Sequence, residues 1–219
     1  MIVTKRKPLS EILDNIIKDK NIFLIGCSLC ATTCKTGGEY QVREIAKLLK
    51  ENGKKVTGWA VLDPACNGIV IKRFSRERKK ELDESDAVLS LACGGGTQAV
   101  FNGLKRKKVY PANDTLFQGD AARITLKEAE FGQKCSLCGE CVLAVTGGIC
   151  PVTRCAKGLV NGPCGGIKNG KCEVDDTLDC AWLLIYDRLK ELDQLNEMEK
   201  IRQPKDHSKS RKPQNLVVK

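Results

Sequence analysis

Histidine is almost absent from the sequence: there is one in 219 residues, His207, close to the C-terminus. This excludes a Ser-His-Asp triad, histidine acid-base catalysis and histidine-ligated zinc. No apolar run reaches the ~18 residues of a membrane-spanning helix, and residues 1–20 lack the continuous apolar segment of a signal peptide. The G-x-G-x-x-G and P-loop signatures are missing as well. We therefore predict a cytoplasmic protein with no membrane span, no catalytic residue and no flavin or nicotinamide site of its own.

Net positive charge is scarce over most of the chain, although the formal total is +10. Lys5, Arg6 and Lys7 supply +3 in residues 1–8, six cations against Asp206 supply +5 in residues 201–219, and +2 remains for the rest. Charge at the two ends is typical of solvated tails and not of a nucleic-acid-binding face. We predict a basic disordered tail over 201–219 and no nucleic-acid partner. Docking of the tail on an acidic subunit is the alternative.

Cysteine, in contrast, is abundant: the chain has thirteen, and eight lie within residues 134–182. Cys135, Cys138 and Cys141 form a C-x2-C-x2-C run, in which each thiol can reach a different iron of one cluster. Cys150-Pro151 resembles the Cys-Pro that ends bacterial ferredoxin motifs, but it follows Cys141 at a wider spacing than in a ferredoxin. Glycine-rich segments separate the other four, Cys155, Cys164, Cys172 and Cys180. The pattern predicts an iron-sulfur domain that is not a ferredoxin fold.

Two other uses of these cysteines compete with iron-sulfur ligation. A zinc ribbon also contains C-x2-C pairs, but tetrahedral zinc gains nothing from the third thiol, Cys141. A disulfide framework belongs to oxidising compartments, which a chain without an export signal does not reach. Iron-sulfur ligation is therefore the favoured interpretation, and zinc is the alternative.

The N-terminal half alternates predicted strands with predicted helices. This β-α-β-α-β-α-β order is typical of a parallel, doubly wound, Rossmann-like α/β domain. The expected strands are 21–26, 56–62, 87–92 and 107–110, and the expected helices are 10–20, 39–52, 75–85 and 97–104. Residues 111–133 are interpreted as a connector without structure of its own, and a helix is expected over 177–200. The predicted domains are the α/β domain (1–120), a small, irregular, cysteine-rich iron-sulfur domain with a C-terminal helix (121–200), and the tail (201–219).

The first three predicted strands each lead to a cysteine: Cys27, Cys66 and Cys93. Loops at the carboxyl ends of parallel strands converge on one crevice, and Cys30 and Cys34 lie in the first of these loops. Five thiols at this edge predict a third cluster or a zinc site. The alternatives are buried thiols acting as small apolar side chains, a thioredoxin-like pair at Cys27 and Cys30, and phosphate binding at the glycines after Cys93.

The cysteine-rich stretch also resembles a known family. The run CSLCGECVLAVTGGICPVTRCAKGLVNGPCGG and the later KCEV and CAWLLIYDRLK closely resemble the C-terminal domain family of methylenetetrahydrofolate reductases. The resemblance is dense over residues 134–192 and weaker over the N-terminal part. Within that family, the chain is similar to the separate iron-sulfur subunit that accompanies the flavoprotein subunit in anaerobes using the reductive acetyl-CoA pathway.

The resemblance implies an electron-transfer subunit of a hetero-oligomer in one-carbon metabolism. The implied partner is a TIM-barrel flavoprotein, carrying FMN, that reduces 5,10-methylenetetrahydrofolate to 5-methyltetrahydrofolate. The resemblance also implies a second redox partner that exchanges electrons with this chain: a ferredoxin, a heterodisulfide-reductase-like module or an NADH-oxidising module. The matching residues suffice for two [4Fe–4S] clusters: Cys135, Cys138, Cys141, Cys150, Cys155, Cys164, Cys172 and Cys180. Their order leaves the ligand assignment open, and ferredoxin-like cross-ligation would give Cys150 to the second cluster.

Two other functions stay open at the level of sequence. One is a zinc-stabilised assembly or nucleic-acid-binding module that uses the basic tails as contacts. The other is a cluster enzyme whose non-cysteine-ligated iron acts as a Lewis acid at the Cys27, Cys66 and Cys93 crevice. Because no folate or flavin site is visible, the chain alone is predicted to be inactive with 5,10-methylenetetrahydrofolate.

Overall fold

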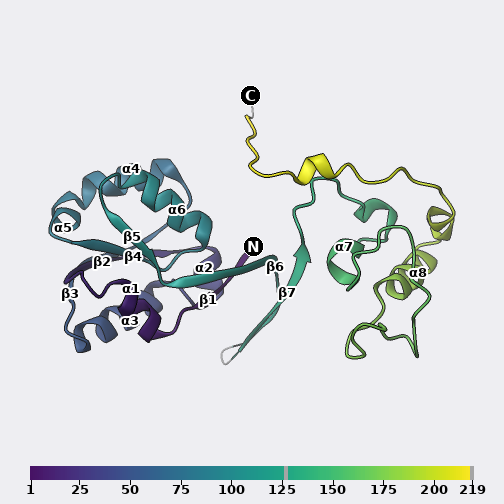
Figure 1. Ribbon diagram of the computed structural model, residues 1–219, viewed down its shortest axis with the longest axis horizontal. Coiled ribbons are helices and arrows are strands. Elements are labelled where there is room, and N and C mark those ends of the chain that lie inside the picture. The colour runs from purple at the N-terminus through teal and green to yellow at the C-terminus, as the bar shows by residue number, and fades with distance from the viewer. Residues whose placement is uncertain (126–127, 218–219) are drawn as a thin grey trace. The chain divides into compact units, whose positions relative to one another are not determined.

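A computed structural model describes residues 1–125 and 128–217 (Figure 1). The chain forms two compact units, Met1–Phe131 and Gly132–Lys219. Residues 126–127 of the expected connector and residues 218–219 of the expected basic tail lie outside the described residues. No helix in the described part of the chain is long and apolar enough to cross a membrane.

The first unit is built on a sheet of four parallel strands, and the prediction of a mixed α/β fold is confirmed. The strands are β2 (Asn21–Cys27), β3 (Lys55–Leu62), β4 (Ala87–Ser90) and β5 (Lys108–Pro111). Their order is β3-β2-β4-β5. β2 lies inside the sheet and is buried along almost its whole length, which explains why its sequence is an uninterrupted apolar run.

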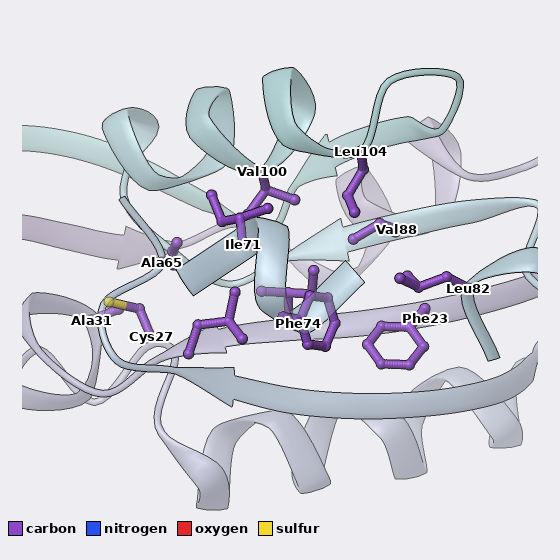
Figure 2. Close-up of a cluster of buried hydrophobic side chains, with 13 residues drawn as sticks. Phe23, Cys27, Ala31, Ala65, Ile71, Phe74, Leu82, Val88, Val100 and Leu104 are labelled. Carbon is purple, nitrogen blue, oxygen red and sulfur yellow. The ribbon is translucent and has the colours of Figure 1, made fainter. Parts of the chain in front are cut away.

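Helices pack on both faces of this sheet. Successive side chains of a strand point to opposite faces, so Ile22 and Leu24 of β2 join one hydrophobic cluster while Phe23 and Ile25 join the other. Figure 2 shows the cluster that contains Phe23, where the Phe74 ring lies beside the Phe23 ring and Val100 lies beside Ile71. The cluster with Ile22 and Leu24 includes side chains of α1 (Leu9–Asn15) and α3 (Glu39–Glu51). The cluster with Phe23 and Ile25 includes side chains of α4 (Gly68–Glu77), α5 (Lys79–Asp83) and α6 (Gly94–Gly103).

One helical region differs from the prediction. The sequence predicts a single helix over 75–85, whereas the structure has α4 and α5, and α4 begins at Gly68. Asn67 caps α4, because its side-chain oxygen accepts a hydrogen bond from the Ile69 backbone N–H at 2.9 Å. Asparagine directly before an apolar stretch is a typical N-cap, and this signal locates the start of the helix.

A second sheet corrects the expectation that residues 111–133 have no structure of their own. It consists of β1 (Ile2–Arg6), β6 (Asn113–Ile124) and β7 (Ala129–Cys135), in the order β1-β6-β7. β1 pairs antiparallel with β6, and Arg6 lies opposite Asn113. Because the partner of β6 comes from the distant N-terminus, the local sequence gives little sign of the pairing.

The second unit has little regular structure. Its hydrophobic cluster consists of three buried side chains, Trp182, Ile185 and Leu189. Its helices are α7 (Pro151–Arg154) and α8 (Ala181–Glu191), with 3-10 turns η1 (Leu143–Val145), η2 (Leu195–Met198) and η3 (His207–Ser210). The helix expected over 177–200 is therefore shorter than predicted. Much of the unit is loop, and the loops carry the cysteines.

Candidate metal centre

The C-x2-C-x2-C run begins at Cys135, the last residue of β7, and continues as a loop. Leu137 and Gly139 have left-handed backbones, with φ of 58° and 75°. The turn at Leu137 allows its backbone N–H to donate to the Cys135 Sγ at 3.3 Å. Cysteine binds metals as the thiolate, and sulfur then accepts such N–H groups. Cys135 and Cys141 are exposed and Cys138 is half-buried.

The C-terminal segment contacts this loop, although the sequence predicts a disordered tail there. Lys205 Nζ donates to the Cys138 Sγ at 3.4 Å and also to the Glu140 backbone carbonyl. The Asp206 backbone N–H donates to the Glu140 carboxylate at 2.7 Å. A hydrogen bond with the Glu140 backbone, followed by the contact with Lys205, lowers the pKa of the Cys138 thiol. Lys205 was not predicted as a site residue, because a lysine in a charged tail carries no local signal of a partner.

Cys150 lies at the start of α7, where Pro151 occupies the first helical position. Thr153 of the same helix donates through its Oγ1 to the Lys134 carbonyl at 3.2 Å. This bond holds α7 beside the residue that precedes Cys135. Cys150 therefore lies on an element that is tied to the C-x2-C-x2-C loop.

Four further cysteines line one narrow cavity of the second unit: Cys155, Cys164, Cys172 and Cys180. Cys155 ends α7 and Cys180 precedes α8. Two backbone bonds link the loops between them, from Cys172 N–H to the Leu178 carbonyl at 2.9 Å and from Cys180 N–H to the Gly170 carbonyl at 3.0 Å. The cavity volume is about 20 Å³, which is room for one water molecule or one ion.

Charged groups surround this cavity. Lys157 is paired with Glu173, and the Cys164 Sγ lies 3.3 Å from the Glu173 Oε1. The contact with Lys157, followed by the one with Cys164, lowers the pKa of the Glu173 carboxyl, and the Lys157 pKa is raised in turn, chiefly by Glu173. Arg154 also lines the cavity. Asp179 lines it as well, so two carboxylates balance the two cations around the four thiols.

Trp182 closes one side of the cavity and connects it to the hydrophobic cluster. Its indole N–H donates to the Leu159 carbonyl at 3.0 Å, which fixes the ring against the loop between Cys155 and Cys164. Ile185 and Leu189 pack on the same helix, α8. The apolar stripe of α8 thus supports the wall of a thiol-lined cavity.

The strand-end cysteines lie at the carboxyl edge of the parallel sheet, as predicted. Cys27 is the last residue of β2 and is 6% exposed, Cys66 lies in the loop after β3, and Cys93 immediately precedes α6. The first two loops are joined, because Ser28 Oγ donates to Asp63 Oδ1 at 2.6 Å and Ser28 N–H to the Leu62 carbonyl at 3.0 Å. Burial raises the pKa of the Cys66 thiol, and the nearby Cys27, Cys93 and Cys30 add to this.

The two cysteines in the first loop contact a different element. Cys30 and Cys34 flank the short helix α2 (Cys30–Thr33), which the sequence did not predict. Cys30 Sγ accepts from the Ile2 N–H at 3.4 Å, and Cys34 Sγ donates to the Ile2 carbonyl at 3.7 Å. Both thiols therefore lie against β1. Cys34 is the least suited of the five to join a shared site, while Cys30 remains within electrostatic range of Cys66.

All thirteen cysteines are free thiols. Within residues 1–125 and 128–217, no three Cys, His, Asp or Glu side chains are already grouped closely enough to hold a metal ion. The donor chemistry nevertheless fits a thiophilic group, because four thiols line one cavity, with the carboxylates of Glu173 and Asp179 beside them. The ligand sets stay predictions.

Comparison with known proteins bears on the second unit. Residues 110–208 match the family model described as methylene-tetrahydrofolate reductase C terminal. The comparisons with curated proteins and with solved structures gave no match. The matched region contains the eight cysteines from Cys135 to Cys180, whereas the strand-end cysteines lie outside it. The family resemblance expected from the sequence is confirmed for these residues.

Proposed function

From the match of residues 110–208 to the family model described as methylene-tetrahydrofolate reductase C terminal, we propose that the protein is the iron-sulfur electron-transfer subunit of a methylenetetrahydrofolate reductase complex. It passes electrons to or from the FMN of a flavoprotein subunit that reduces 5,10-methylenetetrahydrofolate to 5-methyltetrahydrofolate. The chain is not catalytic alone and works in the cytoplasm. The observation that carries the proposal is the donor set: eight cysteines, from Cys135 to Cys180, lie on two groups of loops within the matched region, and the one histidine of that region, His207, lies outside both groups.

The first ligand set consists of Cys135, Cys138, Cys141 and Cys150. Its support is the hydrogen bond between Thr153 and the Lys134 carbonyl, which ties the α7 start to the C-x2-C-x2-C loop. A cross-ligated arrangement, in which Cys150 serves the other set, is disfavoured by the same bond. The Leu137 backbone N–H donates to the Cys135 sulfur, and the Lys205 ammonium group donates to the Cys138 sulfur.

The second ligand set consists of Cys155, Cys164, Cys172 and Cys180. These thiols line one cavity, and the backbone bonds between residues 170–180 hold two of them on a shared frame. Bound clusters would supply one-electron transfer without displacement of atoms. The protein's part is to hold thiolates, to direct N–H groups and cations at them, and to keep water away through Trp182.

The strand-end thiols form a third candidate set. Cys27, Cys30 and Cys66 lie on two loops that Ser28 and Asp63 join. Cys93, directly before α6, lies near enough to raise the pKa of the Cys66 thiol. We propose that this edge binds a third cluster or a zinc ion. This edge lies outside the matched region, so the family match does not support the third set.

The experiment is metal and sulfide analysis of the full chain purified without oxygen. We expect iron and acid-labile sulfide at roughly eight or twelve atoms per chain and a broad visible band that dithionite bleaches. The matched variant is Cys150→Ala, which should erase the EPR signal of one cluster and leave the other. A colourless protein with zinc and no sulfide would overturn the proposal, and loss of the second signal in Cys150→Ala would restore cross-ligation.

One observation favours a second candidate function. The cavity of the second set has room for a single ion, and a four-iron cluster requires its loops to separate. A zinc ion at Cys155, Cys164, Cys172 and Cys180 would make this part of the chain a structural assembly module. One zinc per chain that disappears in Cys172→Ala, with one cluster retained, would support that alternative for the second set alone.

A further inference from the structure

The segment 205–209 packs closely on the loop that carries Cys138. Lys205 contacts the sulfur and the Glu140 carbonyl, the Asp206 N–H donates to the Glu140 carboxylate, and Lys209 Nζ lies 3.5 Å from the Glu140 Oε1. The packing leaves no room for a side chain at Gly139, whose added Cβ would meet the Lys209 carbonyl oxygen at 2.6 Å. The same glycine has a φ of 75°. Two independent features thus require glycine where the tail meets the cysteine loop.

The two lysines of this segment have different partners. Lys205 directs its ammonium group at the Cys138 Sγ and at a neutral carbonyl. Lys209 is instead paired with the Glu140 carboxylate, which offsets its charge. The positive charge that acts on the sulfur therefore comes mainly from Lys205.

We propose that Lys205 is a positioning residue that raises the reduction potential of the cluster bound through Cys135, Cys138 and Cys141. This inference rests on the proposed function. A cluster gains negative charge when it accepts an electron, so a cation and an N–H donor at a ligating sulfur stabilise the reduced state more than the oxidised state. The C-terminal segment thereby sets the driving force for electron transfer although it contributes no ligand.

The test is an EPR-monitored redox titration of the full chain with its clusters bound. Lys205→Gln keeps an N–H donor and removes the charge, so we expect the midpoint potential of one cluster to fall. Lys205→Arg restores the charge and should return the midpoint toward the wild-type value. The matched control, Lys209→Gln, removes an equal charge from the same segment and should shift the midpoint much less.

The outcomes separate this inference from the proposed function. A wild-type chain without iron or sulfide overturns both. Clusters whose midpoints are the same in wild type and Lys205→Gln overturn the role of Lys205 and leave the electron-transfer function standing. An equal fall in Lys205→Gln and Lys209→Gln would also overturn it, because the effect would then come from overall charge and not from the contact with Cys138.

Discussion

The two units of the chain are stabilised in different ways. The first buries two hydrophobic clusters, one on each face of the parallel sheet, while the second buries a cluster of three side chains. Burial of apolar surface is the main favourable contribution to folding. The first unit can therefore fold from its own core, and the second needs another source of stability.

The backbone shows the same difference. Among the described glycines with a left-handed φ, Gly53 belongs to the first unit, and the second contains Gly139, Gly147, Gly148, Gly158, Gly162, Gly165 and Gly170. Glycine-rich loops lose much conformational entropy on folding. Small domains with such loops and a weak core are commonly held together by metals. The comparison indicates that metal binding by the thiols of the second unit would stabilise its fold as well as serve the proposed electron transfer.

Metal removal is the change with the largest expected effect. Without its metal, the second unit should lose its fold, because binding to structural thiolates supplies folding free energy on the order of 10 kcal/mol. The measurement is hydrogen exchange of the full chain before and after chelation under reducing conditions. Amides of 132–217 should lose protection while those of β2 and β4 keep it. If the amides of α8 stayed protected in the metal-free chain, the three buried side chains would be enough to stabilise the second unit. The proposed difference between the two units would then be wrong.

A cavity in the core of the first unit should have the next largest effect. Ile25 is fully buried between the sheet and its helices, so Ile25→Ala is expected to lower the free energy of unfolding by ~2–5 kcal/mol. Urea denaturation of the metal-bound chain, followed by circular dichroism, measures this. The control is Ile69→Ala, because Ile69 is 81% exposed and its loss should change stability by about 0.5 kcal/mol or less. Metal content should be unchanged in both variants.

Sequence periodicity predicted the parts of the fold that depend on local patterns. The buried run of β2 and the spacing of Val42, Ile45 and Leu49 in α3 each match an element of the structure. The strand-end position of Cys27, Cys66 and Cys93 followed from the same reasoning. These features were predictable because an apolar face repeats with the period of its element.

The features that the sequence did not reveal depend on contacts between distant residues. β1 pairs with β6 across most of the first unit, and Lys205 reaches Cys138 from the C-terminal segment. Neither contact leaves a pattern in its neighbouring residues. The cysteine spacing predicted a metal site, but the grouping of Cys155, Cys164, Cys172 and Cys180 at one cavity required the loop geometry.

Acid should destabilise the two units by protonating different groups. The smallest predicted effect that tests this difference comes from Asp86 in the first unit. Its carboxylate accepts from the Asn21 N–H at 2.7 Å and the Lys20 N–H at 2.9 Å, and these bonds lower the Asp86 pKa. Because the Asp86 pKa is lower in the folded state, the carboxylate stabilises the folded protein at pH values above its unfolded-state pKa of about 3.9. This stabilisation is lost as the pH falls through the folded-state pKa.

Asp86→Asn should therefore destabilise the first unit at pH 7 by less than about 1 kcal/mol, because solvent screens an exposed charge, and the difference from wild type should shrink toward pH 3. Urea midpoints of the first unit at both values measure this, and Glu51→Gln on the surface of α3 is the charge-matched control. The second unit should instead lose structure when protons displace metal from its thiolates. If Asp86→Asn altered the acid response of the second unit instead, the two units would not be independently stabilised.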